Sequence, residues 1–555
     1  MHLYADLLFT NGRVYTADVR SPWAEAVAVR GEHVLAVGMA SELAELRGPR
    51  TEVVDLAGWL LLPGFTESHV HFIELALRAT EIDATAAPSA HAVAEMVRAR
   101  IGAEDIAPRP SAWIRGAGWH ASTWTDGVQP HRALLDAVAP DIPVALDSKD
   151  LHSIWLNSAA LRRAGITAAT GDVSGGVIER DADGEPTGVL RENAVGLVYN
   201  AIPKPGLTEI VTAVKATVPA MWATGIVAIH NANDSADGIA LRTYQALRTQ
   251  EELGLRVLQH LPACNLDHAR AIGLQSGLGD AWLRIGGVKF FADGALGSRT
   301  AHMMQPFLDN PSNWGVAAID PEELLERALV ASAAGLSLTI HAIGDRANRD
   351  VLNVLTEVRR QETELRIPMP TGQIRNSQST IRHRIEHVQC IHPDDLPRLA
   401  ELDVIASVQP IHATSDMHMV DRFWGDERAR GAYAFRSLLA SGAKLIFGSD
   451  GPIEPHAPLV GIHAAITRRR ADGSPGPDGW QGQERITVRE AIDAYTIWPA
   501  YAAGEEDYRG SIVPGKVADL VVLSGDIFAM DPMTILDTQV EMTVLDGAVV
   551  WRRLA

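Results

Sequence analysis

The sequence predicts an α/β protein with a (β/α)8 TIM-type barrel, a large insert after the first barrel strand, and a small β-sandwich domain formed from both termini. Eight short apolar runs alternate with helical patterns through the middle of the chain. About 150 residues separate the first run from the second, far more than an ordinary loop. Short runs split by turn residues occur at both ends. A chain of 555 residues is long enough for such a barrel with additions.

Both ends of the chain show the pattern of short strands joined by tight turns. Near the start, Asn11-Gly12 divides two apolar runs and predicts a hairpin, and a second pair turns at Gly31. A third run, 51–64, leads toward the barrel, and runs of the same kind occur at 516–526 and 540–553. We expect one composite β-sandwich from residues 1–60 plus 510–555. Two separate hairpins are the alternative, although each would be marginally stable alone.

The barrel itself is expected from residues 61–74 plus 221–509. Its strands are predicted in eight apolar runs, at 59–71, 225–233, 254–263, 283–294, 335–345, 383–389, 402–410 and 443–452. Helical patterns such as PEELLERALVASAAG separate them. Strands that alternate with helices in this way are typical of parallel β/α units.

Residues 75–220 form the predicted insert. This segment contains helical stretches and a polar hairpin, GGVIERDADGEPTGVL, with its turn at Asp183-Gly184. Because it follows the first barrel strand, we expect a subdomain that lies over the barrel mouth.

The amino-acid composition limits the kinds of molecule that this protein is expected to bind. Acidic residues outnumber basic ones, 69 to 49, and a net charge of -20 repels nucleic acid and anionic membranes. No apolar stretch is long enough to span a membrane, and the N-terminus lacks the pattern of a signal peptide. Two cysteines fit a reducing compartment. We therefore expect a cytoplasmic protein with a small-molecule substrate, and leave open whether it forms a homodimer.

The chemistry-bearing residues lie where the predicted barrel strands end. His69 and His71 end the first strand, and residues two apart on a strand point to the same side. Lys289 lies in the fourth strand, and His341, His387 and Asp450 end the fifth, sixth and eighth. Charged groups in apolar runs are costly unless paired or ligated. The carboxyl ends of barrel strands carry active sites, so these residues predict a metal site, with ordinary buried histidines as the alternative.

This pattern resembles the amidohydrolase superfamily. Longer phrases are similar to its third family, the YtcJ-like group that includes N-substituted formamide deformylases. They are NGRVYT, LPGFTESHVH, PTGVLRENA, VKFFADGALGSRTA, HAIGDRAN, RIEHVQ, GSDGPIEP and SIVPGKVADLVVL. The resemblance extends from residue 6 to about residue 550.

The resemblance implies a ligand set. His69 and His71 would hold the more buried divalent metal, and His341 and His387 a second. Lys289 would bridge the two as a carbamate; a free lysine paired with a carboxylate is the alternative. Zinc is the default ion for His and carboxylate ligands, although iron or manganese fits the same set, and whether one or two ions bind stays open.

The expected reaction is hydrolysis of a non-peptide C–N bond in an amide, formamide, carbamate or cyclic imide by a metal-bound hydroxide. Asp450 would accept the proton of the water and pass it to the departing amine; a carboxylate that only orients a ligand is the alternative. Hydrolysis of an ester or lactone, or cleavage of a C–C bond, on the same metal site is a second hypothesis. A catalytically silent binding protein is the third.

Substrate contacts are predicted at three further positions. Asp293 and Arg299 bracket a glycine-containing loop after the fourth strand, where Arg299 would hold a substrate carbonyl or carboxylate. A structural Asp293–Arg299 pair is equally compatible with the sequence. His152, in the insert, resembles a family position that faces the pocket. His412, which follows the seventh strand, is expected in a loop or in the pocket lining rather than as a ligand.

Overall fold

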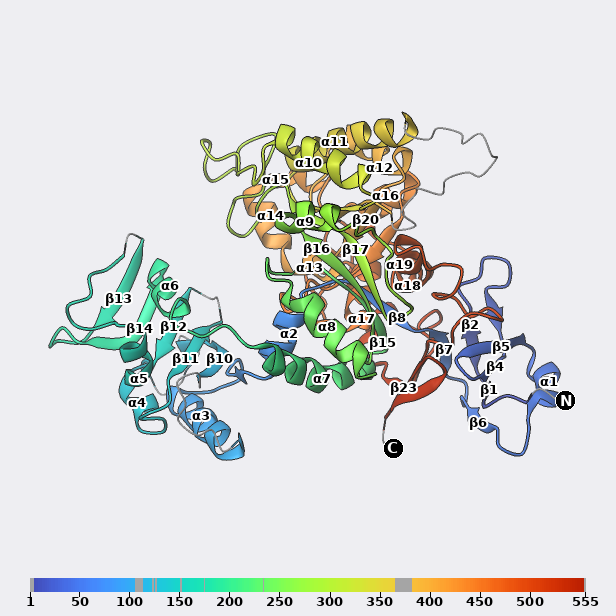
Figure 1. Ribbon diagram of the computed structural model, residues 1–555, viewed down its shortest axis with the longest axis horizontal. Helices are drawn as coiled ribbons and strands as arrows, with labels where there is room; N and C mark the ends of the chain where they lie inside the picture. The colour runs from blue at the N-terminus through green and yellow to red at the C-terminus, as the bar shows by residue number, and fades with distance from the viewer. Residues whose placement is uncertain are drawn as a thin grey trace. The chain divides into compact units, whose positions relative to one another are not determined.

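The computed structural model describes residues 4–104, 113–121, 124, 127–149, 152–173, 175–232, 234–364 and 382–553. The chain divides into two compact units (Figure 1). The first comprises Met1–Phe72 and Lys215–Ala555, and the second comprises Ile73–Val214. The first unit contains a barrel and two further sheets, and the second is built on one sheet of its own.

Eight parallel strands form the barrel of the first unit, each hydrogen-bonded to the next in chain order. They are β8 (Phe65–Val70), β15 (Ile226–Asn231), β16 (Arg256–Pro262), β17 (Leu283–Phe291), β18 (Leu338–Ala342), β19 (Arg384–His387), β20 (Ile405–Val408) and β21 (Leu445–Phe447). A parallel bridge between Val70 and Gly451 joins the two ends of the sheet. Each of the eight predicted runs contains one strand of the barrel, so the barrel is confirmed; residue 233, at the end of the second run, lies outside the described residues.

Helices lie between the barrel strands along the chain and after the last of them, as the alternating pattern predicts. The longer ones are α7 (Leu207–Ala223), α8 (Ile239–Thr249), α10 (Pro321–Ala333), α11 (Asp345–Glu364) and α17 (Pro458–Thr467). Shorter ones are α9 (Leu266–Ala271), α12 (Arg398–Glu401), α13 (Pro410–Ser415), α14 (Met417–Phe423), α15 (Gly425–Ala429), α16 (Phe435–Ala440), α18 (Val488–Asp493) and α19 (Ile497–Ala502).

Both ends of the chain contribute to the two remaining sheets of this unit. A four-stranded sheet has the order β5-β4-β1-β6, and a six-stranded sheet has the order β24-β23-β22-β7-β2-β3. Their bounds are β1 (Leu7–Thr10), β2 (Arg13–Tyr15), β3 (Trp23–Ala24), β4 (Ala26–Arg30), β5 (His33–Gly38), β6 (Glu52–Asp55), β7 (Leu60–Pro63), β22 (Leu520–Leu523), β23 (Val540–Leu545) and β24 (Ala548–Arg552). In Figure 1 the blue β7 and the red β23 belong to the same sheet, in which β22 lies between them.

The pairing of β7 with β22 joins the two ends of the chain. These strands run antiparallel with Leu61 opposite Val522. Leu61 and Val522 are buried in one cluster together with Phe9 and Val27 of the other sheet. Extra sheets formed from the termini are therefore confirmed, and the alternative of two separate hairpins is wrong.

A buried ion pair connects this composite domain to the barrel. Arg256, on β16, donates from Nε to Asp519 Oδ2 at 2.7 Å and from Nη2 to Asp519 Oδ1 at 3.0 Å. The same guanidinium contacts Asp546 at 2.7 Å. Arg256 is 2% exposed and Asp519 is 6% exposed. Because water does not reach Arg256 and Asp519, each of these buried charges needs the opposite charge of the other.

Two local predictions need correction. The Asn11-Gly12 turn does not make a hairpin, since β1 pairs with β4 and β6 whereas β2 pairs with β3 and β7. Asn11 adopts a positive φ of 57°, as expected at such a turn, but the turn carries the chain from one sheet to the other. The first predicted barrel run is divided at Gly64, so that β7 belongs to the sandwich and only β8 to the barrel. The turn at Gly31 does join an antiparallel pair, β4 and β5.

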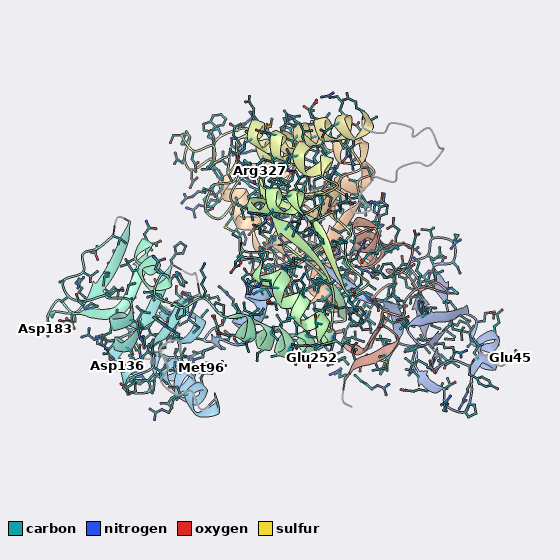
Figure 2. All side chains as sticks on the ribbon, in the orientation of Figure 1. Glu45, Met96, Asp136, Asp183, Glu252 and Arg327 are labelled. Atoms are coloured by element: carbon teal, nitrogen blue, oxygen red, sulfur yellow. The ribbon has the colours of Figure 1, made fainter. Side chains whose placement is uncertain are left out.

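The second unit contains one mixed sheet, in the order β13-β14-β12-β11-β10-β9. Its strands are β9 (Ile82–Asp83), β10 (Ile114–Trp119), β11 (Val144–Ser148), β12 (Ser153–Leu156), β13 (Gly176–Arg180) and β14 (Pro186–Glu192). Its helices include α3 (Ala90–Glu104), α4 (Arg132–Asp136) and α5 (Ser158–Arg163). The predicted polar hairpin is β13–β14, with Asp183 in its turn (Figure 2). That this unit covers the barrel mouth stays a prediction.

No helix in the described ranges has both the length and the apolar character that crossing a membrane requires.

Candidate metal centre and active site

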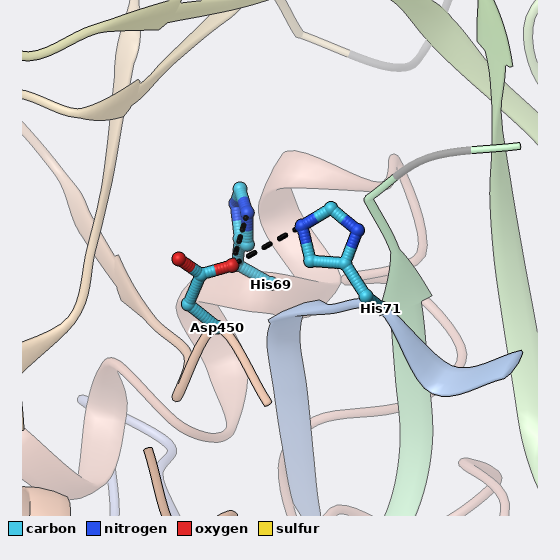
Figure 3. Close-up of side chains that lie close together, drawn as sticks. All are labelled: His69, His71 and Asp450. Atoms are coloured by element: carbon cyan, nitrogen blue, oxygen red, sulfur yellow. Dashed lines mark ion pairs between the residues drawn. The ribbon is translucent and has the colours of Figure 1, made fainter. Parts of the chain in front are cut away.

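The His-x-His segment lies at the carboxyl end of β8. His69 is fully buried within the strand, and His71 follows the strand and keeps some exposure. The Nε2 atoms of both rings face one oxygen of Asp450 (Figure 3). His69 Nε2 lies 3.3 Å from Asp450 Oδ1, and His71 Nε2 lies 3.2 Å from the same oxygen. The alternation of a strand thus brings two imidazoles to one point, as predicted.

Backbone hydrogen bonds fix Asp450 opposite these histidines. Asp450 follows β21, and its N–H donates to the His69 carbonyl at 2.8 Å. The N–H of His71 donates to the Gly451 carbonyl at 2.8 Å. Asp450 has a φ of 58°, in the left-handed region that non-glycine residues rarely adopt. The seam between the first and last barrel strands therefore sets the position of the carboxylate.

The histidines of β18 and β19 lie against the same group. The ring centroid of His387 is 4.6 Å from that of His341 and 4.8 Å from that of His69. His387 ends β19 with a φ of 75°. Four of the predicted ligands and Asp450 are thus gathered at one end of the barrel.

A buried carboxylate orients His69. Glu386, the residue before His387, accepts a short hydrogen bond from His69 Nδ1, and its other oxygen lies 2.5 Å from Arg384 Nε. All three side chains are almost fully buried. Burial raises the pKa of the Glu386 carboxyl, but Arg384 and His69 outweigh burial and hold that pKa well below its usual range. With its Nδ1 proton held by Glu386, His69 presents Nε2 to Asp450.

Two other imidazoles are oriented in the same manner. His387 Nδ1 lies 2.9 Å from Gln409 Oε1, which can only accept, so its Nε2 keeps a lone pair. His341 Nε2 lies 3.0 Å from the Gly294 carbonyl oxygen, so its Nδ1 keeps the lone pair. Burial lowers the pKa of His341 to about 4 and holds that of His387 well below its usual range. Both rings are neutral at pH 7, the state in which imidazole binds a metal.

The pKa values of His69 and Asp450 reflect their burial and the charges that surround them. Burial lowers the pKa of His69, but Glu386 and Asp450 outweigh burial and raise it. Burial raises the pKa of Asp450, but the contacts with His69 and His71 keep it well below its usual range. A metal ion can take the place of the Nε2 proton of His69 in such a setting.

The donor atoms fit a divalent metal. His69 Nε2 and Asp450 Oδ1 are buried and have no hydrogen-bond partner among the described residues. Buried polar atoms are normally satisfied, so unpartnered atoms that converge indicate a missing ligand. Two groups of potential ligand atoms occur in the described part of the chain: His69, His71 and Asp450, and His387, His412 and Asp450. Asp450 belongs to both.

His412 is the member that the sequence did not predict as a ligand. It lies in α13, directly after β20, and is 6% exposed. Within each group the ligand atoms lie within 4.8 Å of one another, so a His412 ring nitrogen is that close to both Asp450 and His387. His341, although its ring contacts that of His387, belongs to neither group. The sequence indicated His412 only weakly, because the alternation of a strand does not predict the direction of a side chain on a helix.

Lys289 lies in β17 and is 2% exposed. Burial lowers the pKa of its ammonium to about 8. Its Nζ lies 5.0 Å from the ring centroid of Phe291, and no described carboxylate forms an ion pair with it. The carboxylates of Glu386 and Asp450 nevertheless favour its charged form, so the paired free lysine stays an alternative. A buried amine of lowered pKa is suited to react with carbon dioxide. The carbamate itself stays a prediction.

Asp293 and Arg299 have separate partners. Asp293 is buried and accepts the N–H groups of His302, Ile343 and Gly344 at 2.8–3.0 Å. Burial raises its pKa to about 7. Arg299 donates to Asp309 at 2.7 Å and keeps substantial exposure. The alternative Asp293–Arg299 pair is not formed. Their contacts with a substrate stay predictions, and the backbone bonds give Asp293 a structural role as well.

His152 belongs to the second unit. Its Nδ1 lies 2.9 Å from Glu192 Oε2, and both side chains are exposed. Its predicted contact with the substrate is untested. In the same unit Trp119, Trp124 and Trp155 pack together with ring centroids 6.2–6.4 Å apart in a buried cluster. These tryptophans form part of the core of the unit.

The fold and the ligand groups define the class of the protein. A parallel barrel that gathers histidines and an aspartate at the carboxyl ends of its strands is the arrangement of a metal-dependent hydrolase. The model of the amidohydrolase family matches residues 52–551. The chain therefore belongs to the amidohydrolase family.

This chain is similar to known proteins over almost its whole length. It is 32% identical to the putative amidohydrolase YtcJ of Bacillus subtilis, over 98% of this chain and 99% of YtcJ. It is 28% identical to the N-substituted formamide deformylase of Arthrobacter pascens, over 99% of this chain and 98% of the deformylase. The crystal structure of an uncharacterized metal-dependent hydrolase from Pyrococcus furiosus matches with a TM-score of 0.75 and 28% identity, over 94% of this chain and 99% of that chain.

Proposed function

We propose that this amidohydrolase cleaves a non-peptide C–N bond, in an amide, formamide, carbamate or cyclic imide. The observation that carries the proposal is a single carboxylate, Asp450, shared by two groups of imidazole nitrogens at the mouth end of the barrel. The relative named as an N-substituted formamide deformylase supports this substrate class.

The residues present fit a divalent ion. His69, His71 and Asp450 would hold one ion, and His341 and His387 would hold a second, with a carbamate on Lys289 as the proposed bridge. Zinc is the preferred ion for this donor set, because imidazole nitrogen and carboxylate oxygen are its usual ligands in hydrolases. When bound, the ion lowers the pKa of water to about 7 and polarises a carbonyl group.

Asp450 has the geometry of a proton carrier. Its Oδ1 faces His69 and His71, whereas Oδ2 points away from both rings (Figure 3). Oδ2 is thus the atom that accepts the proton of the attacking water and delivers it to the nitrogen of the departing amine. Burial raises its pKa, but the contacts with His69 and His71 hold that pKa well below its usual range, so the carboxylate is ionised at neutral pH.

A substrate panel tests the proposal. The purified protein, loaded with zinc, is assayed against N-formyl amines, N-acyl amines, carbamates, cyclic imides and esters, with release of amine or alcohol as the readout. We expect turnover of at least one C–N substrate and none without metal. If an ester is hydrolysed and every C–N compound is inert, the ester alternative replaces this proposal.

The variant Asp450→Asn isolates the proton carrier. The amide keeps an oxygen toward the histidines but cannot accept the proton, so we expect kcat to fall about 10²–10⁴-fold. Metal content per chain, measured by plasma mass spectrometry, should stay at the wild-type value when zinc is in excess. Unchanged kcat would remove Asp450 as the carrier.

A further inference from the structure

We propose that His412 acts as a catalytic hydrogen-bond donor, whose Nε2–H binds the carbonyl oxygen of the substrate while the C–N bond is broken. This inference rests on the proposed amide hydrolysis and adds a residue to it. The ligand set implied by the resemblance does not include His412.

His412 lies beside His387 and Asp450, where we propose that the reaction takes place. One of its ring nitrogens lies within 4.8 Å of a ring nitrogen of His387 and of a carboxylate oxygen of Asp450. Its ring is parallel to that of His387, at an interplanar angle of 9° and a centroid distance of 6.5 Å. Its Nε2 is buried and has no hydrogen-bond partner in the described ranges. The ring of His412 therefore carries an unsatisfied nitrogen and lies beside His387 and Asp450.

The side-chain amide of Gln389 determines which ring nitrogen of His412 carries the proton. Gln389 Nε2 lies 3.4 Å from His412 Nδ1. An amide nitrogen can only donate, so Nδ1 is the acceptor, and a neutral imidazole has its one N–H on Nε2. His387 shows the opposite arrangement, since Gln409 offers it an oxygen at 2.9 Å. His387 thus presents a lone pair to the site, whereas His412 presents a donor.

A donor at this place assists the bond changes of hydrolysis. When the oxygen of water adds to the carbonyl carbon, the electron pair of the C=O bond moves onto the carbonyl oxygen, which becomes an oxyanion. The Nε2–H of His412 stabilises that charge. As the C=O bond re-forms, the C–N bond breaks, and its electron pair stays on nitrogen, which takes the proton from Asp450. Removal of one such donor typically lowers kcat about 10²–10³-fold.

Three variants distinguish a hydrogen-bond donor at His412 from a metal ligand and from a residue without a role in the reaction. His412→Ala removes the donor, and His412→Gln restores an amide N–H of similar reach. His383→Gln is the matched control, because His383 is a buried histidine at the start of β19 that is paired with Glu362 outside both ligand groups. For each protein we would measure zinc per chain, kcat and KM on the best substrate of the panel, and the ¹⁵N spectrum of histidine-labelled enzyme.

The expected result is wild-type zinc content in all three variants. In His412→Ala, kcat should fall about 10²–10³-fold with KM changed far less, because the bond forms mainly in the transition state. His412→Gln should recover part of kcat, and His383→Gln should keep it. The histidine signals lost in His412→Gln should be those of a ring protonated at Nε2.

Two outcomes would overturn the inference. Loss of one equivalent of zinc in His412→Ala, together with an unprotonated Nε2, would make His412 a metal ligand. Unchanged kcat would leave it without a role in the reaction. If the wild type turns over no C–N compound, the proposed function fails, while zinc content and the ¹⁵N spectrum still show whether His412 is a donor or a ligand.

Discussion

Replacement of Glu386 with Gln should weaken metal binding although Glu386 is not a predicted ligand. One oxygen of Glu386 accepts from His69 Nδ1, and the other pairs with Arg384 Nε. Gln supplies one oxygen and one NH₂, so a donor must face either His69 or Arg384. If it faces His69, the proton of that ring moves to Nε2 and removes the lone pair that would bind the metal. If it faces Arg384, two donors oppose each other in a buried site, and in either orientation the guanidinium loses its counter-charge.

The expected loss of metal affinity in Glu386→Gln follows from the loss of the hydrogen-bond acceptor behind His69. Loss of a hydrogen-bonded partner behind a metal-binding histidine typically lowers metal affinity about 10–100-fold. That factor corresponds to about 1.4–2.8 kcal/mol of binding free energy. Loss of the counter-charge of Arg384 costs about 3–5 kcal/mol of folding free energy in either orientation. The conformer in which NH₂ faces His69 should dominate, because an imidazole can change tautomer and accept the bond whereas a guanidinium can only donate.

A competition assay measures the change. Metal-free protein is titrated with zinc in the presence of a chromophoric chelator, for the wild type, Glu386→Gln and the control Glu362→Gln. Glu362 offers a matched pair, because its carboxylate contacts His383 at 2.9 Å and Arg359 at 2.7 Å away from the ligand groups. Zinc affinity of Glu386→Gln within twofold of the wild type would refute the reasoning, as would an equal loss in Glu362→Gln.

Two further predictions concern stability. Arg256→Met leaves the buried Asp519 without its guanidinium, so the free energy of unfolding in urea should fall by about 3–5 kcal/mol, and addition of Asp519→Asn should recover part of it; a loss below 1 kcal/mol would contradict the role of this pair. Burial raises the pKa of Asp493 from 3.8 to about 6 although Tyr15 donates to it at 2.7 Å. The folded state thus holds this proton more tightly than the unfolded state, and the ionised group destabilises the fold above pH 6. Asp493→Asn should therefore stabilise the protein by about 2–3 kcal/mol above pH 6, and the gain should fade as pH falls to about 3.8; a gain that is the same at pH 4 and pH 8 would speak against this cause.

Much of the barrel could be predicted because each strand is a short apolar run bounded by turn residues. The turn at Asn11-Gly12 was misinterpreted because local sequence fixes the bend but not the partners of the strands on either side. Those partners are chosen by long-range packing, as Leu61 and Val522 show.

The candidate site was predictable where strand register governs it, at His69 and His71. Glu386 and His387 are neighbours in β19, and regular alternation would send them to opposite faces. Both nevertheless contact His69, and His387 has a φ of 75° at the end of the strand. No sequence pattern reveals such a backbone change. His412 was missed for a related reason, since its direction depends on how α13 begins after β20.

The pairing of β7 with β22 has a consequence for synthesis of the chain. β7 ends at Pro63, and its partner begins only at Leu520. At about 5–20 residues per second, the ribosome needs roughly 20–90 s to produce the intervening segment. Throughout that interval the buried leucines of β7 lack one neighbouring strand, and an unpaired strand edge invites association with other chains. The nascent protein therefore passes through a long period in which the edge of β7 is open to association with other chains.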